Sequence, residues 1–406
     1  MVADSKSGLA SAQADGTRVR RRPKDRKAQI VRAASRAFSE RGFHPVGVNE
    51  IAAEVGISGP ALYRHFRSKY ALLVAATEGG AQLLLDAAQA TDDPGLAPEA
   101  RIITLIRTLA AHVVDVRREG GLYRWERRYL EGDDRRRIRL IYDELQATVE
   151  SAIAEVHPDV DPNDVAIIGT GMLSTIGSIT LHRAALPRAT LVDLLQDICW
   201  SILHTELPPA PPRPAAEIPV RGLPQSSKRE RLLTEAIRSF GRQGYHEASI
   251  EEIGAAVGIN ASSVYRYFPS KSELLAAAFH RTGERIAIAN AEALAEASSR
   301  ADAALRIADR FARVNFAMPE ILPVYFAEFS NLPAAEQRRL LAVQRQNVLE
   351  WASLLDDEPT EARFRVHAAI AQVVDVGHRL RFDRRPESLA RVHALMRAVL
   401  LGNNCD

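Results

Sequence analysis

One stretch of this sequence occurs twice, and the repeat constrains the fold more than any other feature. The shared runs are Val55-Gly56-Ile57-Ser58, Tyr63-Arg64-His65-Phe66 and Ser68-Lys69 within residues 26–73, and Val257-Gly258-Ile259-Asn260, Tyr265-Arg266-Tyr267-Phe268 and Ser270-Lys271 within residues 228–275. Each residue follows its counterpart by 202 positions, so the two copies align without a gap. Because a repeat at the spacing of a whole domain indicates a duplicated module, the sequence predicts two similar halves.

Each copy has the pattern of short helices joined by a tight turn. In the first copy, apolar residues recur at helical spacing up to Phe38, and Gly42 marks the end of that helix. A second helix is expected over about residues 48–55, and Ser58 is placed to cap a third. Two short helices joined by a glycine-containing turn predict a helix-turn-helix, whose second helix enters the major groove of DNA.

The complete pattern resembles the DNA-binding segment of the TetR/AcrR family of bacterial transcriptional regulators. The resemblance covers only the two repeated segments. It implies that each half is all-α, with a three-helix DNA-binding domain followed by a helical bundle for ligand binding and dimerisation. The residues it implies at bases are Ser58, Gly59, Pro60, Ala61 and Arg64 in the first copy and Asn260, Ala261, Ser262, Ser263 and Arg266 in the second. Those it implies at phosphates are Tyr63, His65, Lys69, Tyr265, Tyr267 and Lys271.

The two recognition helices differ in what they offer a base. Pro60 suits the first turn of a helix and provides only apolar contact, for example with a thymine methyl group. Ser262 and Ser263 can form hydrogen bonds instead. The halves are therefore expected to read different half-sites, which predicts an asymmetric or pseudo-palindromic operator in double-stranded DNA.

Composition is that of a soluble globular protein, with 46% hydrophobic and 26% charged residues in a chain of 406. No uninterrupted apolar run approaches the roughly 20 residues of a membrane span, and the N-terminus lacks the apolar core of a signal peptide. The two cysteines, Cys199 and Cys405, form neither a disulfide framework nor a metal-binding pattern. We expect a cytoplasmic protein without membrane association, cofactor or metal.

Changes in composition divide the chain into segments. The expected organisation is a basic arm over residues 1–23, DNA-binding domains over 24–73 and 228–275, helical ligand-binding and dimerisation domains over 74–206 and 276–406, and a proline-rich linker over 207–227. The arm is either a solvated tail or a segment that reaches phosphates or the minor groove. No segment combines alternating hydrophobicity with β-branched residues, so the chain is predicted to be all-α.

The resemblance implies that the last two long helices of each half form a four-helix dimer interface. These helices are expected over about residues 163–185 and 190–206, and over about 360–382 and 387–400. The two halves of one chain could pair as a pseudo-dimer, or two chains could form a homodimer. Tethering favours the pseudo-dimer, because a linked partner has an effective concentration of about a millimolar.

The middle helices of each half are implied to enclose a pocket for a small hydrophobic effector. An acyl chain, a sterol or a drug-like compound would suit an apolar pocket with few polar anchors. The alternative for each candidate side chain is simple core packing. The candidates are His112, Tyr123, Trp125, Met172 and His182 in the first half, and Phe316, Met318, Tyr325, Phe326, Phe329, His367 and His378 in the second.

Two other classes of function were compared with regulation. An enzyme is not expected, since the sequence has no glycine-rich phosphate loop, HExxH, paired-cysteine site or GxSxG elbow. A non-specific architectural DNA binder, or a protein-interaction module without ligand control, remains the alternative. The expected function is a sequence-specific regulator, in particular a repressor released by its ligand.

Overall fold

The computed structural model describes residues 26–91, 93–122, 129–212 and 226–402, and these residues confirm the all-α prediction. Within those ranges no β-strand occurs. The expected basic arm, the candidates Tyr123 and Trp125, and most of the proline-rich linker lie outside the described residues.

The two halves have a similar order of helices. The first half contains α1 (Arg26–Arg41), α2 (Val48–Glu54), α3 (Gly59–Tyr63), α4 (Lys69–Gln89), α5 (Pro98–Asp115), α7 (Gly132–Val156), α8 (Pro162–Ser178), the 3₁₀ turn η2 (Ile179–Leu181) and α9 (Arg188–Leu203). The second half contains α10 (Lys228–Glu247), α11 (Ile250–Val257), α12 (Ala261–Tyr265), α13 (Lys271–Glu296), α14 (Arg300–Ala317), α15 (Ile321–Glu328), the 3₁₀ turn η3 (Phe329–Asn331), α16 (Ala334–Ala352), α17 (Pro359–Arg379) and α18 (Pro386–Leu401).

One helix ends earlier than the sequence predicted. Helicity was expected up to residue 185, whereas α8 ends at Ser178 and the 3₁₀ turn η2 follows it. The half-buried guanidinium of Arg117 donates to the carbonyls of Ile179, His182 and Ala184, with 2.6 Å to each of the last two. Because this side chain, which follows the end of α5, holds the three carbonyls, the segment leaves the helical path.

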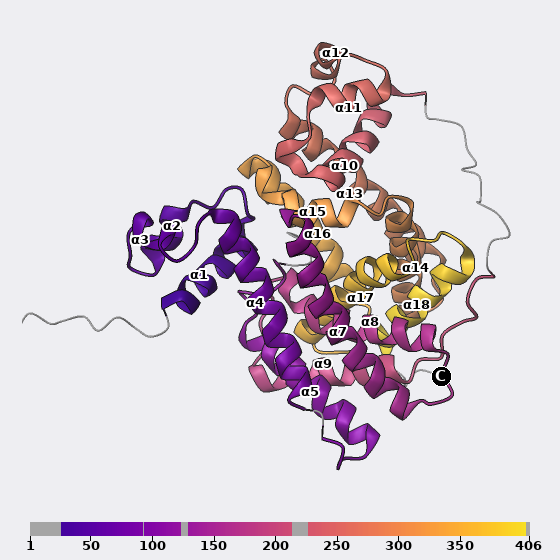
Figure 1. Ribbon diagram of the computed structural model, residues 1–406. Helices are drawn as coiled ribbons and strands as arrows, with labels where there is room; N and C mark the ends of the chain where they lie inside the picture. The colour runs from indigo at the N-terminus through magenta and orange to yellow at the C-terminus, as the bar shows by residue number, and fades with distance from the viewer. Residues whose placement is uncertain (1–25, 92, 123–128, 213–225, 403–406) are drawn as a thin grey trace, which may run out of the picture.

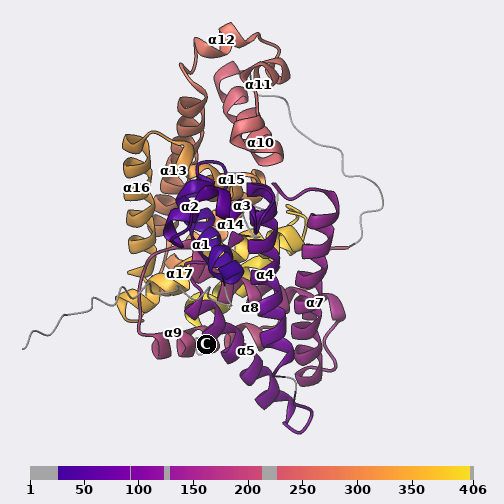
Figure 2. The ribbon, with the colours of Figure 1, turned by 60° about the vertical axis from the view of Figure 1, so that its left-hand side comes forward.

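The two DNA-binding domains project from a shared helical body. In Figure 1, α1–α3 lie at the left beside α4, and α10–α12 extend at the top beyond α15. The turned view of Figure 2 keeps α10–α12 at the top and brings α1–α3 to the front. Each domain has its own apolar core, centred on Phe38, Leu62 and Phe66 in the first and on Phe240, Val264 and Phe268 in the second.

The remaining helices of both halves share one hydrophobic core. Side chains of α5, α8 and α9 from the first half and of α14, α17 and α18 from the second belong to the same buried cluster. Within it, α8 packs along α17, and α9 lies against α18. These are the helices that the sequence assigned to pairing.

Polar contacts accompany this apolar packing between the halves. The fully buried Gln372 amide donates to the carbonyl oxygen of Gly171 at 2.9 Å and to Thr175 Oγ1 at 3.0 Å. Ser174 Oγ donates to Asp375 Oδ2 at 2.7 Å. Each contact joins α8 to α17, and each uses different residue types on its two sides.

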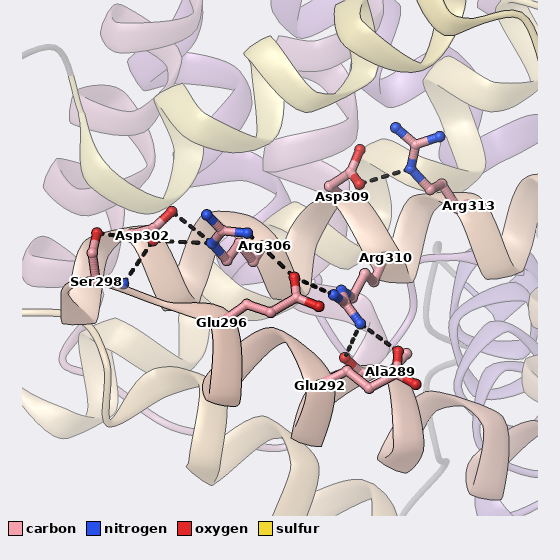
Figure 3. A network of polar contacts seen from close by, with 9 residues as sticks. All are labelled: Ala289, Glu292, Glu296, Ser298, Asp302, Arg306, Asp309, Arg310 and Arg313. Carbon is pink, nitrogen blue, oxygen red and sulfur yellow. Dashed lines mark hydrogen bonds and ion pairs between the residues drawn. The ribbon is translucent and has the colours of Figure 1, made fainter.

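Ion pairs connect α13 and α14 on the outside of the second half. Across the two helices, Arg310 bonds Glu292 and Glu296, and Arg306 bonds Glu296 at 3.4 Å, as Figure 3 shows. Within α14, Arg306 bonds Asp302 at 2.9 Å. The carboxylate of Asp302 also accepts from the backbone N–H of Ser298 at 2.8 Å, at the start of α14. The network supplements the packing of α13 on α14, although exposed pairs of this kind stabilise by only about 0–1 kcal/mol each.

Among the residues that the structure describes, two segments are long and apolar enough to cross a membrane by length and composition alone. They are α4 and residues 162–181, and their most apolar windows are 44% and 67% buried inside the protein. The sequence expectation of no such segment was therefore too strict, because it required an uninterrupted apolar run. Buried core helices satisfy the same criterion, so this is weak evidence for a membrane span.

Candidate nucleic-acid interface and cavity

The first recognition helix, α3, presents a polar face to solvent. Ser58 is its N-cap, and Ser58 Oγ accepts a hydrogen bond from the N–H of Ala61. Leu62 is fully buried and anchors the helix in the domain core, whereas Tyr63 is 50% exposed. Pro60, Arg64 and His65 are exposed beside Tyr63. One face of the helix therefore holds the domain together and the opposite face is open to a ligand.

The second recognition helix, α12, repeats this arrangement with other side chains. Asn260 is its N-cap and accepts from the N–H of Ser263 at 2.9 Å and from Ser262 Oγ at 2.9 Å. Val264 is fully buried, and Tyr265 and Tyr267 are 48% and 42% exposed. The exposed faces carry Arg266 together with these two tyrosines. Hydroxyl and amide groups thus replace the proline found in α3.

The predicted contact residue Gly59 has a different surrounding from the others. It is buried, and a Cβ atom added to it would overlap Asn49 Oδ1 of α2. In the second copy the small residue stands on the other helix, since a Cβ on Gly254 of α11 would lie 2.9 Å from Val264 Cγ2 of α12. A glycine on one of the two helices lets them approach closely, which is a packing role.

The two lysines predicted at phosphates also hold the loops of their domains. Lys69 Nζ donates to the carbonyl oxygen of His44 at 2.9 Å and lies 4.6 Å from the ring centroid of Phe43. Lys271 Nζ donates to the carbonyls of His246 and Ala248, at 3.2 and 3.0 Å. Burial lowers the pKa of the Lys271 ammonium. Lys69 is also the first residue of α4, and Lys271 is the first residue of α13. Each positive charge lies where the N-terminus of its helix attracts anions.

A cavity of about 1260 Å³ lies mainly among helices of the first half. Its apolar wall includes Leu109, Val113, Leu145, Leu173 and Ile176, which come from α5, α7 and α8. Neutral polar groups, among them Thr170 and Gln146, interrupt this wall. Burial lowers the pKa of His112, which also lines the cavity, although nearby Asp115 acts in the opposite direction. Charged side chains, among them Glu78, Arg139 and Asp375, also line it. A largely apolar wall with such polar groups suits a hydrophobic ligand that carries a polar end.

Elements outside the first bundle complete the cavity wall. Lys27, Val31 and Ser35 of the DNA-binding helix α1 line it, as do Val374 and His378 of α17 from the second half. The sequence singled out His112 and His378 separately, and the structure brings both to this one cavity. It did not single out the α1 positions, which have the ordinary alternation of an amphipathic helix and no distinguishing signal.

The other candidate pocket residues that the structure describes lie in packed regions. Met172 is 1% exposed in the shared core, and His182 stacks on His367 with ring centroids 3.9 Å apart. In the second half the aromatic candidates contact other aromatic rings. Between ring centroids, Phe316 lies 5.3 Å from Phe382, and Tyr325 lies 5.1 Å from Phe279. The rings of Phe326 and Phe329 lie 5.6 and 5.2 Å from the ring of Tyr325. Met318 packs against the core of the second DNA-binding domain.

Comparison with known proteins places both repeated segments in one family. The model of bacterial regulatory proteins of the tetR family matches residues 30–76 and 232–278. The HTH-type transcriptional activator FasR of Mycolicibacterium smegmatis is 48% identical over 56 residues, which are 14% of this chain and 26% of that protein. The regulator BetI of Rhizobium meliloti is 28% identical over 159 residues, covering 36% of this chain and 74% of that one.

Among solved structures, a tetR-family regulatory protein from Rhodococcus RHA1 is 21% identical, with a TM-score of 0.40 over 44% of this chain and 96% of that one. The match to FasR spans about a quarter of that relative's length, and a match to YerO of Bacillus subtilis spans 19% of it. The detailed sequence likeness to these two relatives therefore concerns a segment of the size of one DNA-binding domain.

Proposed function

Because both halves of the chain carry the DNA-binding domain of the bacterial tetR family, to which the chain belongs, we propose that it regulates transcription by binding one operator with both domains. The observation that carries this proposal is the pair of exposed, N-capped recognition helices α3 and α12 on one polypeptide. The two helices expose different side chains. The operator is accordingly proposed to contain two unlike half-sites.

Arg64 and Arg266 provide the first test. Selection of bound sequences from random duplex DNA is expected to return two unlike half-sites, bound by one chain per duplex. Arg64→Ala should relax the sequence preference in one half-site and Arg266→Ala in the other. Each should weaken binding by about 1–3 kcal/mol, because a bidentate arginine–guanine contact contributes that much discrimination. The measurement is fluorescence anisotropy on the selected site and on single-base variants of each half.

Arg313→Ala is the matched control, since this exposed arginine pairs with Asp309 on α14, within the helical body (Figure 3). This variant should keep the wild-type affinity and the wild-type sequence preference at both half-sites. A perfect palindrome would contradict unlike half-sites. Binding that varies with salt but has no sequence preference would favour the alternative of an architectural DNA binder.

The two halves are proposed to pair within one chain. Support comes from the contacts between α8 and α17, where Gln372 meets Gly171 and Thr175, and Asp375 meets Ser174. Two identical α17 helices facing each other would not supply these partners. Because these polar contacts join unlike residues of α8 and α17, they favour the intramolecular pseudo-dimer over a homodimer of chains.

The cavity of the first half is the proposed site of the effector. A ligand there would touch α1 of the first DNA-binding domain and α17 of the second half at once. It could therefore change the placement of the first recognition helix relative to the second, which is how we propose that DNA is released. The direction of regulation is proposed to be repression, and it is tested by transcription from a promoter carrying the selected site, with and without the protein.

Leu173→Trp tests the cavity, because the larger side chain should occupy space that a ligand needs. A thermal-shift screen of acyl chains, sterols and drug-like hydrophobic compounds should find a class that stabilises the wild type. A ligand at 100 times its Kd stabilises by about 2.7 kcal/mol, and we expect the variant to lose this shift while still binding DNA. Leu173→Met, with nearly the same volume, should keep it. An equal shift in the tryptophan variant would place the ligand elsewhere.

A further inference from the structure

The two DNA-binding domains touch each other at equivalent positions of the repeat. His44 follows α1 and His246 lies in the last turn of α10, and the two residues are separated by the same 202 positions as the rest of the repeat. Their ring centroids are 4.6 Å apart, with the planes inclined by 42°. The contact therefore joins the loop before α2 to the segment before α11, which are the segments that lead into the two helix-turn-helix motifs.

Tyr129 of the first half lies between the two domains. Its ring contacts His44 edge to face at 4.6 Å between centroids, and Phe43 at 5.8 Å. On its other side it rests on the backbone of Gly244, where an added Cβ would lie 3.0 Å from Tyr129 Oη. Gly244 also has a φ of 84°, a conformation that favours glycine. The second DNA-binding domain thus has no side chain at the place where the tyrosine packs.

The second half closes this junction from the side of α15 and η3. Ala327, Glu328 and Asn331 line the remaining gap together with Phe43 and Pro45. The gap measures only about 10 Å³, too small for more than about one water molecule. Glu328 is 1% exposed and accepts from the N–H of Tyr245 at 2.9 Å and from Asn331 Nδ2 at 2.7 Å. The junction is therefore closely packed around the buried Glu328 and connected to the second domain by hydrogen bonds, while His246 itself keeps an exposed side.

Each loop in the junction is also connected to the helix that follows its recognition helix. Lys69 at the start of α4 holds the carbonyl of His44, and Lys271 at the start of α13 holds the carbonyl of His246. The recognition helices α3 and α12 lie directly before these lysines in the chain. A displacement of one recognition helix relative to the other would consequently disturb the histidine contact.

We infer that the junction of His44, Tyr129, Gly244 and His246 fixes the distance and rotation between α3 and α12, so that the protein accepts a single spacing of its half-sites. This inference rests on the proposed function, binding of one operator by both domains. One added base pair moves a half-site by about 3.4 Å along the duplex and rotates it by roughly 35°. Rigidly joined domains can follow such a change only if the DNA or the junction deforms.

The test uses the full chain and the site selected from random DNA. Duplexes with one base pair inserted or removed between the half-sites are compared with the original by anisotropy. The wild type should lose more than about tenfold in affinity on either change, because the duplex must untwist to restore the phase. The His44→Ala/His246→Ala and Tyr129→Ala variants should lose less than about threefold on the same changes, because their domains can adjust.

Two controls separate spacing from folding. Tyr129→Phe, which keeps the ring, and His204→Ala, an exposed histidine beside Trp200, should retain the wild-type spacing penalty. Thermal unfolding shows whether each variant is folded. A wild type that tolerates several spacings, or variants that keep the full penalty, would overturn the inference while leaving the proposed function intact. Enrichment of no sequence would remove the proposed function, and the inference with it.

Discussion

Replacing Arg391 with alanine is expected to destabilise the protein by about 3 kcal/mol. Arg391 of α18 is 1% exposed and forms an ion pair with Asp164 in the first turn of α8, so the pair joins the two halves. Removing one partner of a buried pair costs about 3–5 kcal/mol, since the other charge is left uncompensated. The Asp164 side chain is 25% exposed, so water compensates in part and we expect the lower end of that range. Urea unfolding measures the change.

Arg107→Ala provides the matched comparison. Arg107 pairs with Asp193 at 2.8 Å, but their side chains are 46% and 57% exposed, and exposed pairs contribute about 0–1 kcal/mol. The double change Arg391→Met/Asp164→Leu removes both charges and should recover most of the lost stability. A loss below about 1 kcal/mol in Arg391→Ala would mean that this pair does not help to hold the halves together.

Acid is expected to destabilise the contact between the halves through a second buried pair. His182 and His367 stack with their planes inclined by 6°, one from each half. Burial lowers the pKa of His367 to about 3, and it also lowers the pKa of His182 well below its usual value, with the neighbouring His367 and Arg117 acting in the same direction. Both rings are therefore neutral in the folded protein at pH 7.

The sign of the pH effect follows from proton uptake. In the unfolded chain the histidines titrate near about 6.5, so below that pH the unfolded state binds protons that the folded state excludes. The free energy of unfolding should fall by up to about 1.4 kcal/mol per pH unit for each histidine as the pH decreases below about 6.5, and for His367 this fall continues toward about pH 3. Their contribution to stability is complete above pH 6.5 and is lost during this descent.

Urea unfolding between pH 7 and pH 4.5 measures this slope. His367→Phe keeps a stacked ring without a titrating group, and we expect it to reduce the slope by the share of one histidine, up to about 2.7 kcal/mol over two pH units. Equal slopes in the wild type and His367→Phe would show that the pair does not exclude protons.

These contacts connect stability to the proposed regulation. The cavity, the α8–α17 contact and the junction of the DNA-binding domains all involve residues of both halves. A ligand that moves α17 relative to α8 would therefore act on the same surfaces that hold the recognition helices in place. Because tightly packed interfaces have discrete arrangements, a small shift at the cavity can change the placement of a whole domain.

The sequence by itself determined the local features. The repeat at 202 positions, the glycines at helix ends and the N-caps Ser58 and Asn260 predicted two helix-turn-helix domains, and the helices follow these signals closely. Such features depend on backbone hydrogen bonds and on side chains a few residues apart, so a short segment of sequence is enough to determine them. The exposed side chains of the recognition helices followed from the same periodicity.

Only the tertiary structure decided which distant residues meet. Nothing in the sequence distinguishes His378, which reaches the cavity of the other half, from His367, which stacks on His182 in the interface. The positions of Tyr129 on Gly244 and of Arg391 beside Asp164 are likewise contacts between halves. These partners depend on how whole helices pack, because shape and burial summed over the shared core select one arrangement that no single segment encodes.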